Sequence, residues 1–327
     1  MPCNLRPNSL ALRTRRLVMF AIRLRRPLIA SVAAVCLTVL PVLADERPKA
    51  KPSPHTAEPS EATRSNSDDI AGALVIVGGG GFPDDIRDRF VQLAGGKAGK
   101  LVIIPTASEK ADRTGKSPSF DYWQAQGLAS VSTLHTLDPK KANDPSFVKP
   151  LTEATAGWLD GGDQVRLANA YRGTAVEKEL RRLLAHGGVI GGTSAGASVM
   201  SEVMIAGGNP QAKVSQGFGL LPNVVIDQHF RNRHRQKRLL GVLAHYPRCV
   251  GLGIDEQTAV VVKGHTFTVL GKANVSVCLP PTDGDEGVVQ LLKSGEEGDL
   301  LQLREKVLAR LKTPGEGRTT AVRATTP

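Results

Sequence analysis

Short apolar runs alternate with amphipathic segments through the middle of this 327-residue chain, and that order constrains its fold more than any other feature. Runs such as Ala73–Val77 have the length of buried strands, whereas the segments between them repeat apolar residues at helical spacing. This alternation predicts an α/β fold with a mostly parallel sheet covered on both faces. We expect strands at 73–77, 101–105, 129–134, 155–159, 188–191, 223–227, 249–254, 258–263 and 266–270, the last two forming a hairpin. We expect helices at 84–94, 119–126, 163–171, 174–186, 195–204, 232–245 and 295–311.

The N-terminus has the order of an export signal. Residues 1–26 are rich in arginine, an apolar stretch runs from Pro27 to Leu43, and Ala44 offers a small residue for cleavage. We expect a signal peptide at 1–44 that is cleaved near Ala44, which would place the mature protein in the periplasm or outside the cell. An uncleaved anchor is the alternative, although the apolar stretch is short for a membrane span.

The remaining chain divides into three parts. Residues 45–69 are rich in Pro, Ser, Lys, Glu and Asp and read as a disordered linker. Residues 70–311 are expected to form one folded domain, and 312–327 a disordered tail.

The basic charge of the chain belongs largely to its N-terminus. The formal net charge is +11, but residues 1–44 hold seven arginines and no acid, which leaves 35 basic against 31 acidic residues elsewhere. This balance gives no electrostatic reason to expect nucleic acid as a partner. A homodimer is compatible with the sequence.

Two cysteines, Cys249 and Cys278, follow the expected cleavage point. An oxidising compartment permits a disulfide between them, but separate thiols are the favoured interpretation, because spacing alone does not bring their Cα atoms within bridging distance.

The segment Gly192-Thr193-Ser194-Ala195-Gly196 matches the G-x-S-x-G pattern in which a serine nucleophile sits on a sharp turn. An apolar run precedes it and a small-residue segment follows, which is the required strand–turn–helix context. Backbone N–H groups at the start of that helix, beginning with Ala195, could stabilise an oxyanion. The alternative is a small-residue turn after a buried strand.

A serine nucleophile needs a base, and His229 is the best placed histidine. It follows an apolar run, so it is expected at the carboxyl edge of the sheet, where Ser194 also emerges. A structural histidine is the alternative. The chain has no H-E-x-x-H and no paired C-x-x-C motif, so no metal is expected.

Two glycine loops follow apolar runs. Gly78–Gly81 lacks the helix and third glycine of a dinucleotide-binding loop, because Phe82 and Pro83 stand there, and no cofactor is expected. It is either a tight turn or a wall of the site. The second loop, Gly161-Gly162-Asp163-Gln164, follows the expected strand at 155–159. The backbone N–H of Gly162 or Asp163 could complete an oxyanion hole.

The segment after His229 is strongly basic. A solvated helix face is the simplest interpretation, but arginines beside the base also suit a substrate that carries carboxylates. The basic residues are Arg231, Arg233, His234, Arg235, Lys237 and Arg238.

Together these motifs resemble cyanophycinase and its relatives in peptidase family S51. The motifs are Gly78-Gly79-Gly80, Pro105-Thr106-Ala107-Ser108, Gly161-Gly162-Asp163-Gln164, Gly192 to Ala197, Asp227-Gln228-His229-Phe230 and Gly253-Ile254-Asp255-Glu256. The resemblance implies a three-layer α/β sandwich similar to class I glutamine amidotransferases (flavodoxin-like), with Ser194 as nucleophile and His229 as base. It also implies a substrate pocket lined by Gln164, Asp227, Gln228, Arg233, Arg235 and Arg238.

One position departs from the family pattern. The family has a carboxylate between the nucleophile helix and the histidine strand, and here the corresponding stretch of residues 207–213 holds no acid. We therefore expect Gln211, or less favourably Asn209, in the place of the acid that orients His229. Asp227 and Glu202 are the next candidates.

The resemblance implies a serine exopeptidase that hydrolyses cyanophycin, an aspartate polymer with arginine on its side chains, to β-Asp-Arg dipeptides, and the N-terminal signal pattern predicts that it is exported. The substrate would then be a peptide or polymer rich in aspartate and arginine. Two alternatives remain: a hydrolase of other aspartyl peptides, and a binding protein with little or no turnover, which the altered acid position favours.

Overall fold

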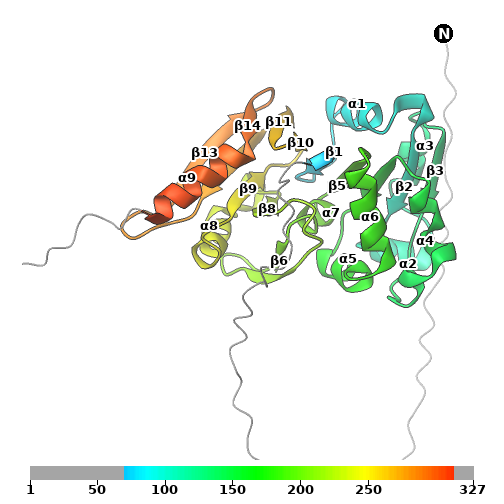
Figure 1. Ribbon diagram of the computed structural model, residues 1–327, viewed down its shortest axis with the longest axis horizontal. Helices are drawn as coiled ribbons and strands as arrows, with labels where there is room; N and C mark the ends of the chain where they lie inside the picture. The colour runs from blue at the N-terminus through cyan, green and yellow to red at the C-terminus, as the bar shows by residue number, and fades with distance from the viewer. Residues whose placement is uncertain (1–69, 313–327) are drawn as a thin grey trace, which may run out of the picture. The chain divides into compact units, whose positions relative to one another are not determined.

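A computed structural model describes residues 70–312 of the chain (Figure 1). The expected signal peptide at 1–44, the linker at 45–69 and residues 313–327 of the expected tail lie outside this range.

A central sheet of eight strands organises the described residues. Its five strands β3-β2-β4-β5-β1 run parallel, and β10, β11 and β14 extend it in antiparallel pairs beside β1. The hairpin expected around Lys263-Gly264-His265 is confirmed as β10–β11. The strands are β1 Ile70–Val77, β2 Lys100–Ile104, β3 Ser130–Thr133, β4 Ala156–Leu159, β5 Val189–Thr193, β10 Thr258–Gly264, β11 Thr266–Gly271 and β14 Glu297–Asp299.

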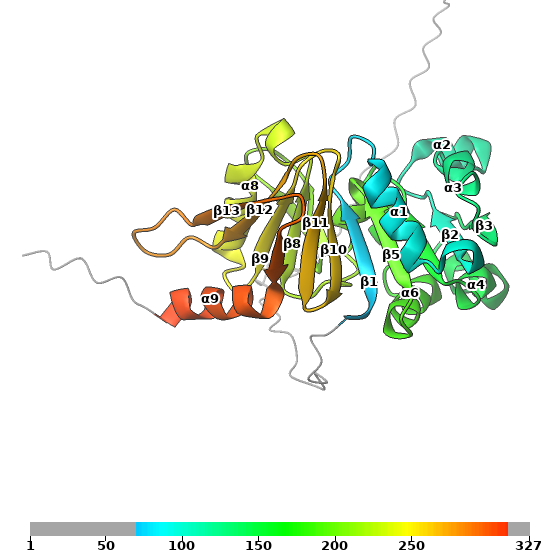
Figure 2. The same ribbon diagram turned by 90° about the horizontal axis from the view of Figure 1, so that it is seen from above.

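Successive residues of β1 enter different hydrophobic cores, because side chains of a strand alternate between its faces. Val75 and Val77 pack on one face with helices α1 and α3, whereas Leu74 and Ile76 pack on the other with α4, α5 and α6. Figure 2 shows α1 across the first of these faces. The fold is thus a three-layer α/β sandwich, as the sequence predicted. The helices are α1 Asp84–Leu93, α2 Glu109–Thr114, α3 Phe120–Gln124, α4 Pro145–Thr152, α5 Gln164–Tyr171 and α6 Ala175–Ala185.

A second sheet of four strands, in the order β13-β12-β9-β8, packs beside the first. One of its faces joins the larger core, and α8 covers the other. Strands β12 and β13 were not expected from the sequence, and most of β13 is exposed although Val288, Val289, Leu291 and Leu292 are apolar. The elements are β8 Val224–Gln228, β9 Val250–Ile254, β12 Asn274–Leu279, β13 Val288–Lys293, α8 Gln236–His245 and α9 Leu300–Lys312.

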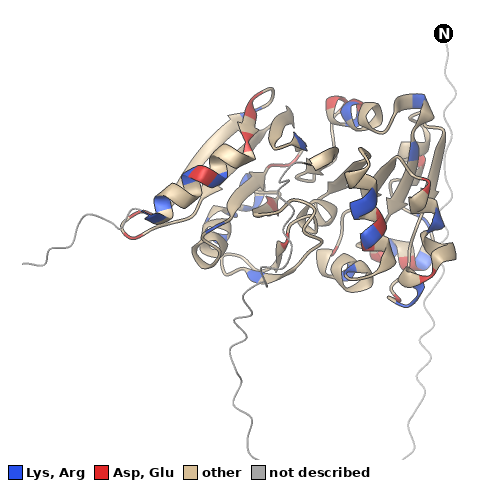
Figure 3. Cartoon of the chain, viewed as in Figure 1, with Lys and Arg blue, Asp and Glu red and all other residues tan. Residues whose placement is uncertain are grey.

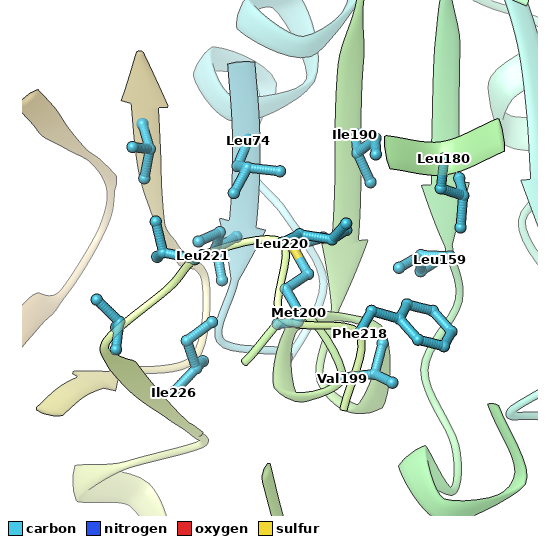
Figure 4. Close-up of a cluster of buried hydrophobic side chains, with 14 of the residues drawn as sticks. Leu74, Leu159, Leu180, Ile190, Val199, Met200, Phe218, Leu220, Leu221 and Ile226 are labelled. Carbon is cyan, nitrogen blue, oxygen red and sulfur yellow. The ribbon is translucent and has the colours of Figure 1, made fainter. Parts of the chain in front are cut away.

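The prediction of a helix at 195–204 is wrong beyond the first helical turn. Helix α7 spans only Ala195–Ser198, after which the chain forms a hairpin of β6 (Val203–Gly207) and β7 (Lys213–Gln216). A short apolar run of this length fits a strand as well as a helix. Val199 and Met200, just after α7, point into the core below the turn (Figure 4).

Basic and acidic residues both occur along α6 and α9 (Figure 3), whereas α8 carries Lys237 and Arg238 and no acid. None of the helices within residues 70–312 combines the length and apolarity needed to cross a bilayer. Cys249 and Cys278 are free thiols, in agreement with the favoured interpretation.

Gly191 in β5 allows two large rings to pack on the sheet. A Cβ at this position would lie 2.4 Å from Cε3 of Trp158 and 2.7 Å from Cε2 of Phe90, and both side chains are fully buried. We predict that Gly191→Ala lowers the free energy of unfolding by about 1–3 kcal/mol, because the rings must shift in a close-packed core. Urea titration of the purified variant measures this.

Gly241→Ala is the matched control for that prediction. Gly241 is exposed within α8 and nothing lies within 4 Å of its Cβ position. Alanine there should raise stability by up to about 1 kcal/mol through helix propensity. Equal midpoints for the wild type and the Gly191 variant would contradict the packing argument.

Candidate active site

Ser194 occupies a strained turn between β5 and α7. Its backbone has φ 53° and ψ −108°, and its N–H donates to the carbonyl of Val77 at the end of β1. The flanking glycines permit the turn: a Cβ on Gly192 would lie 2.6 Å from the carbonyl oxygen of Gly196, and one on Gly196 would lie 2.1 Å from that of Leu159. The turn therefore holds the serine at the carboxyl edge of the sheet.

His229 follows β8 and faces Ser194. The distance between Nε2 of His229 and Oγ of Ser194 is 2.9 Å. The backbone of His229 is also unusual, with φ 48°, and its N–H donates to the carbonyl of Gly78 at 2.8 Å. The structure thus brings together the nucleophile and base that the sequence proposed.

The Gly78–Gly81 loop forms the wall behind this pair. A Cβ on Gly79 would lie 2.3 Å from Cε1 of the His229 ring, and one on Gly80 would lie 2.7 Å from Cβ of Glu256. Both glycines also have positive φ, at 101° and 70°. Of the two interpretations of this loop, a turn that lines the site fits the structure.

Glu256 supplies the carboxylate that the sequence analysis placed elsewhere. Its Oε1 lies 2.6 Å from Nδ1 of His229, and its N–H donates to Oδ1 of Asn232. Glu256 follows β9 in the turn that leads to β10, so it comes after the histidine in the chain and not before it.

The expectation for Gln211 is therefore corrected. Gln211 is exposed in the turn between β6 and β7, and the amide nitrogen of nearby Asn209 donates to the carbonyl of Arg233. Asp227 is fully engaged with arginines, as described below. Glu256 was not predicted, because the family pattern was taken to place the acid before the histidine in the chain. The segment Gly253-Ile254-Asp255-Glu256 nevertheless carries a signal, an acidic pair directly after the buried strand β9.

These contacts determine which nitrogen of His229 carries the proton. The Glu256 carboxylate can only accept, so Nδ1 donates to it and Nε2 is left to accept the hydroxyl proton of Ser194. Burial lowers the pKa of His229 below the ordinary 6.5, Arg233 acts in the same direction, and the hydrogen bond to Glu256 opposes them. The ring is consequently neutral near pH 7 and able to act as a base.

Two backbone N–H groups are available for an oxyanion. Among the described residues, those of Ala195 and Gly162 make no hydrogen bond, and a Cβ on Gly161 would lie 3.4 Å from that of Ser194. Asp163 is excluded as a donor, which corrects the expectation for that residue. Its N–H donates to Ala107 at 2.9 Å, and its side chain caps α5.

Three of the expected pocket residues are held by internal contacts. Gln164 donates from Nε2 to the carbonyls of Ile205 and Ala206, at 2.8 and 3.2 Å. Asp227 and Arg238 form a buried bidentate pair, with Arg238 Nε 2.9 Å from Asp227 Oδ2. This pair is structural in the free protein, and Arg238 also donates to the carbonyl of Gly208.

Arg235 and Arg233 lie closer to solvent than Arg238. Arg235 Nη1 donates to the carbonyl and to Oε1 of Gln228, at 2.6 and 2.7 Å, and burial lowers the pKa of Arg235 to about 10. Arg235 also lies 3.5 Å from Asp227, whereas Arg233 is exposed and its guanidinium makes no hydrogen bond or ion pair within residues 70–312. Of the three arginines, Arg233 is the one free to bind a substrate carboxylate.

We predict that Glu256→Gln lowers kcat about 10²–10⁴-fold, because an amide holds the ring without supporting the charge of the imidazolium. The same change should move the pKa of His229 further down, since the hydrogen bond to Glu256 raises it. Titration of the ring by NMR measures the second effect without a substrate. Gln211→Glu should change neither quantity, and a gain in activity from that variant would contradict the assignment of Glu256.

Comparisons with known proteins identify the family of the chain. The model of peptidase family S51 matches residues 74–270. A cyanophycinase of Geminocystis herdmanii is 33% identical over 220 residues, covering 64% of this chain and 80% of the relative, and one of Synechococcus elongatus is 35% identical over 215 residues, covering 62% and 66%. A crystal structure of a peptidase from an acI-B1 Actinobacterium superposes with TM-score 0.56 at 25% identity, covering 71% of this chain and 98% of that one. The chain belongs to peptidase family S51 and is a serine-type peptidase.

Proposed function

We propose that the protein is an exported exopeptidase that hydrolyses cyanophycin to β-Asp-Arg dipeptides. The observation that carries the proposal is the continuous chain of contacts from Ser194 through His229 to Glu256. The substrate class is supported by the relatives described as cyanophycinases and by the arginines beside His229. Export is supported by the order of basic, apolar and small residues at the N-terminus.

The reaction follows from the site. His229 Nε2 takes the proton of the Ser194 hydroxyl while Oγ attacks the peptide carbonyl, and the N–H groups of Ala195 and Gly162 stabilise the oxyanion. His229 then gives this proton to the leaving amine, which breaks the peptide bond and leaves an acyl-enzyme. Water, activated by the same ring, releases the acid product and restores the serine.

Glu256 also bears on the alternatives. A protein that binds without turnover was favoured by the apparent loss of the triad acid, and this support disappears once Glu256 occupies that role. A hydrolase of other aspartyl peptides remains the second candidate, because an exposed Arg233 would bind carboxylates of either substrate.

We predict that the purified protein releases β-Asp-Arg from cyanophycin and that Ser194→Ala lowers turnover at least about 10³-fold. Mass spectrometry of the soluble products measures this. Ser198→Ala is the matched control, because the buried Ser198 hydroxyl has no hydrogen-bond partner among the described residues and its loss should leave turnover unchanged. Cleavage of aspartyl dipeptides without attack on the polymer would instead establish the second candidate.

The arginines should separate into two classes. Arg233→Ala should raise KM for acidic substrates about tenfold with little change in kcat, because a charged hydrogen bond to the substrate is lost. Arg238→Ala should instead lower the free energy of unfolding by about 3–5 kcal/mol, because it leaves Asp227 buried without its partner.

Steady-state kinetics and urea titration distinguish these effects, and the exposed Arg248 offers a surface control that should change neither. An unchanged KM in the Arg233 variant would remove that residue from the pocket.

A further inference from the structure

Asp160 is a buried carboxylate at the edge of the active site with no role in the mechanism above. It follows β4 directly, and its N–H continues the sheet by donating to the carbonyl of Ile104. Its side chain lies on the same face as that of Trp158, two residues earlier, because residues alternate along an extended strand. Asp160 is 4% exposed.

Only neutral groups hold the Asp160 carboxylate. The hydroxyl of Ser117 donates to Oδ2 and that of Ser119 donates to Oδ1, both at 2.6 Å. The two serines belong to the loop between α2 and α3, where the N–H of Ser119 also donates to the hydroxyl of Ser117. Burial raises the pKa of Asp160, against the hydrogen bonds of Ser117, Ser119 and the Trp158 side chain that lower it.

Other buried acids in the described part of the chain are paired with cations. Asp227 pairs with Arg238, Asp255 with Arg231 and Glu177 with Arg181. No lysine, arginine or histidine within residues 70–312 pairs with Asp160. A buried carboxylate without a cation carries a desolvation penalty that hydroxyl groups offset only in part.

The position of Asp160 connects it to the reacting atoms. The next residue, Gly161, approaches Ser194 so closely that a Cβ there would lie 3.4 Å from the serine Cβ. Half-buried Phe82, from the loop that backs His229, lies 5.1 Å from the ring of Trp158. Aromatic rings beside a carboxylate form surroundings that suit a planar cation.

The carboxylate also has acceptor capacity left. An ionised carboxylate offers about four lone-pair sites, and the two serines and the nearby Trp158 side chain account for at most three of them. The capacity that is left can accept an N–H group of a guanidinium.

We propose that Asp160 binds a cationic side chain of the substrate next to Ser194 and so determines a preference for arginine-bearing substrates. The need for a cation follows from the unpaired carboxylate of Asp160 alone. That this cation is a guanidinium rests on the proposed function.

Binding to the Ser194→Ala protein tests this without turnover. The probes are a short aspartate oligomer that carries arginine and the matched oligomer that carries citrulline, whose urea replaces guanidinium without the charge. By calorimetry, the arginine oligomer should bind at least about tenfold more tightly than the citrulline oligomer. Adding Asp160→Asn should reduce this ratio to within about twofold of unity.

A further variant controls for charge. Asp121→Asn removes an exposed acid close to the same loop and should keep the ratio. If Asp160→Asn retains the preference, or if Asp121→Asn removes it, the proposal is overturned.

The outcomes separate this proposal from the proposed function. Hydrolysis of the polymer by the wild type, with a ratio unaffected by Asp160→Asn, overturns the role of Asp160 alone. An arginine preference that depends on Asp160, without hydrolysis of the polymer, supports that role and overturns the cyanophycin activity. Failure of both oligomers to bind overturns both.

Discussion

The hydrogen bond between His229 Nδ1 and Glu256 determines the state of the active site, and several distant parts of the fold serve to keep it in place. His229 comes from the end of β8, Glu256 from the turn after β9, and the backbone behind both from the loop after β1. These strands belong to two different sheets. The sheets must pack together before a proton can be taken from Ser194, so activity depends on the complete fold rather than on any one motif.

Much of this arrangement could be predicted from sequence because it follows from local rules. Alternating strands and helices indicated the layered fold, and the positions of Ser194 and His229 after apolar runs indicated one edge of the sheet. The identity of the acid did not follow, because Glu256 reaches the histidine through strand packing that sequence order does not reveal. The segment after Ser198 failed for another reason: its apolar run is too short to distinguish a strand from a helix.

The arginine-rich segment shows how burial changes the meaning of a charge run. In sequence, Arg233, Arg235 and Arg238 look equivalent and all suit an acidic substrate. In the structure their roles are graded with depth: Arg238 neutralises Asp227 in the core, Arg235 secures Gln228, and Arg233 faces solvent. The sequence indicated an acidic ligand. Only the contacts distinguish Arg233, whose guanidinium is free, from Arg235 and Arg238, whose guanidinium groups are already hydrogen-bonded within the protein.

The close approach of Gly79 to His229 has a consequence for the direction in which a substrate lies. With backbone against one side of the imidazole and Glu256 on Nδ1, the ring has no room to turn over during a reaction cycle. The nitrogen that receives the proton from Ser194 must therefore deliver it from the same place. The departing amine has to leave across Nε2, and this requirement orients the scissile peptide bond over the serine.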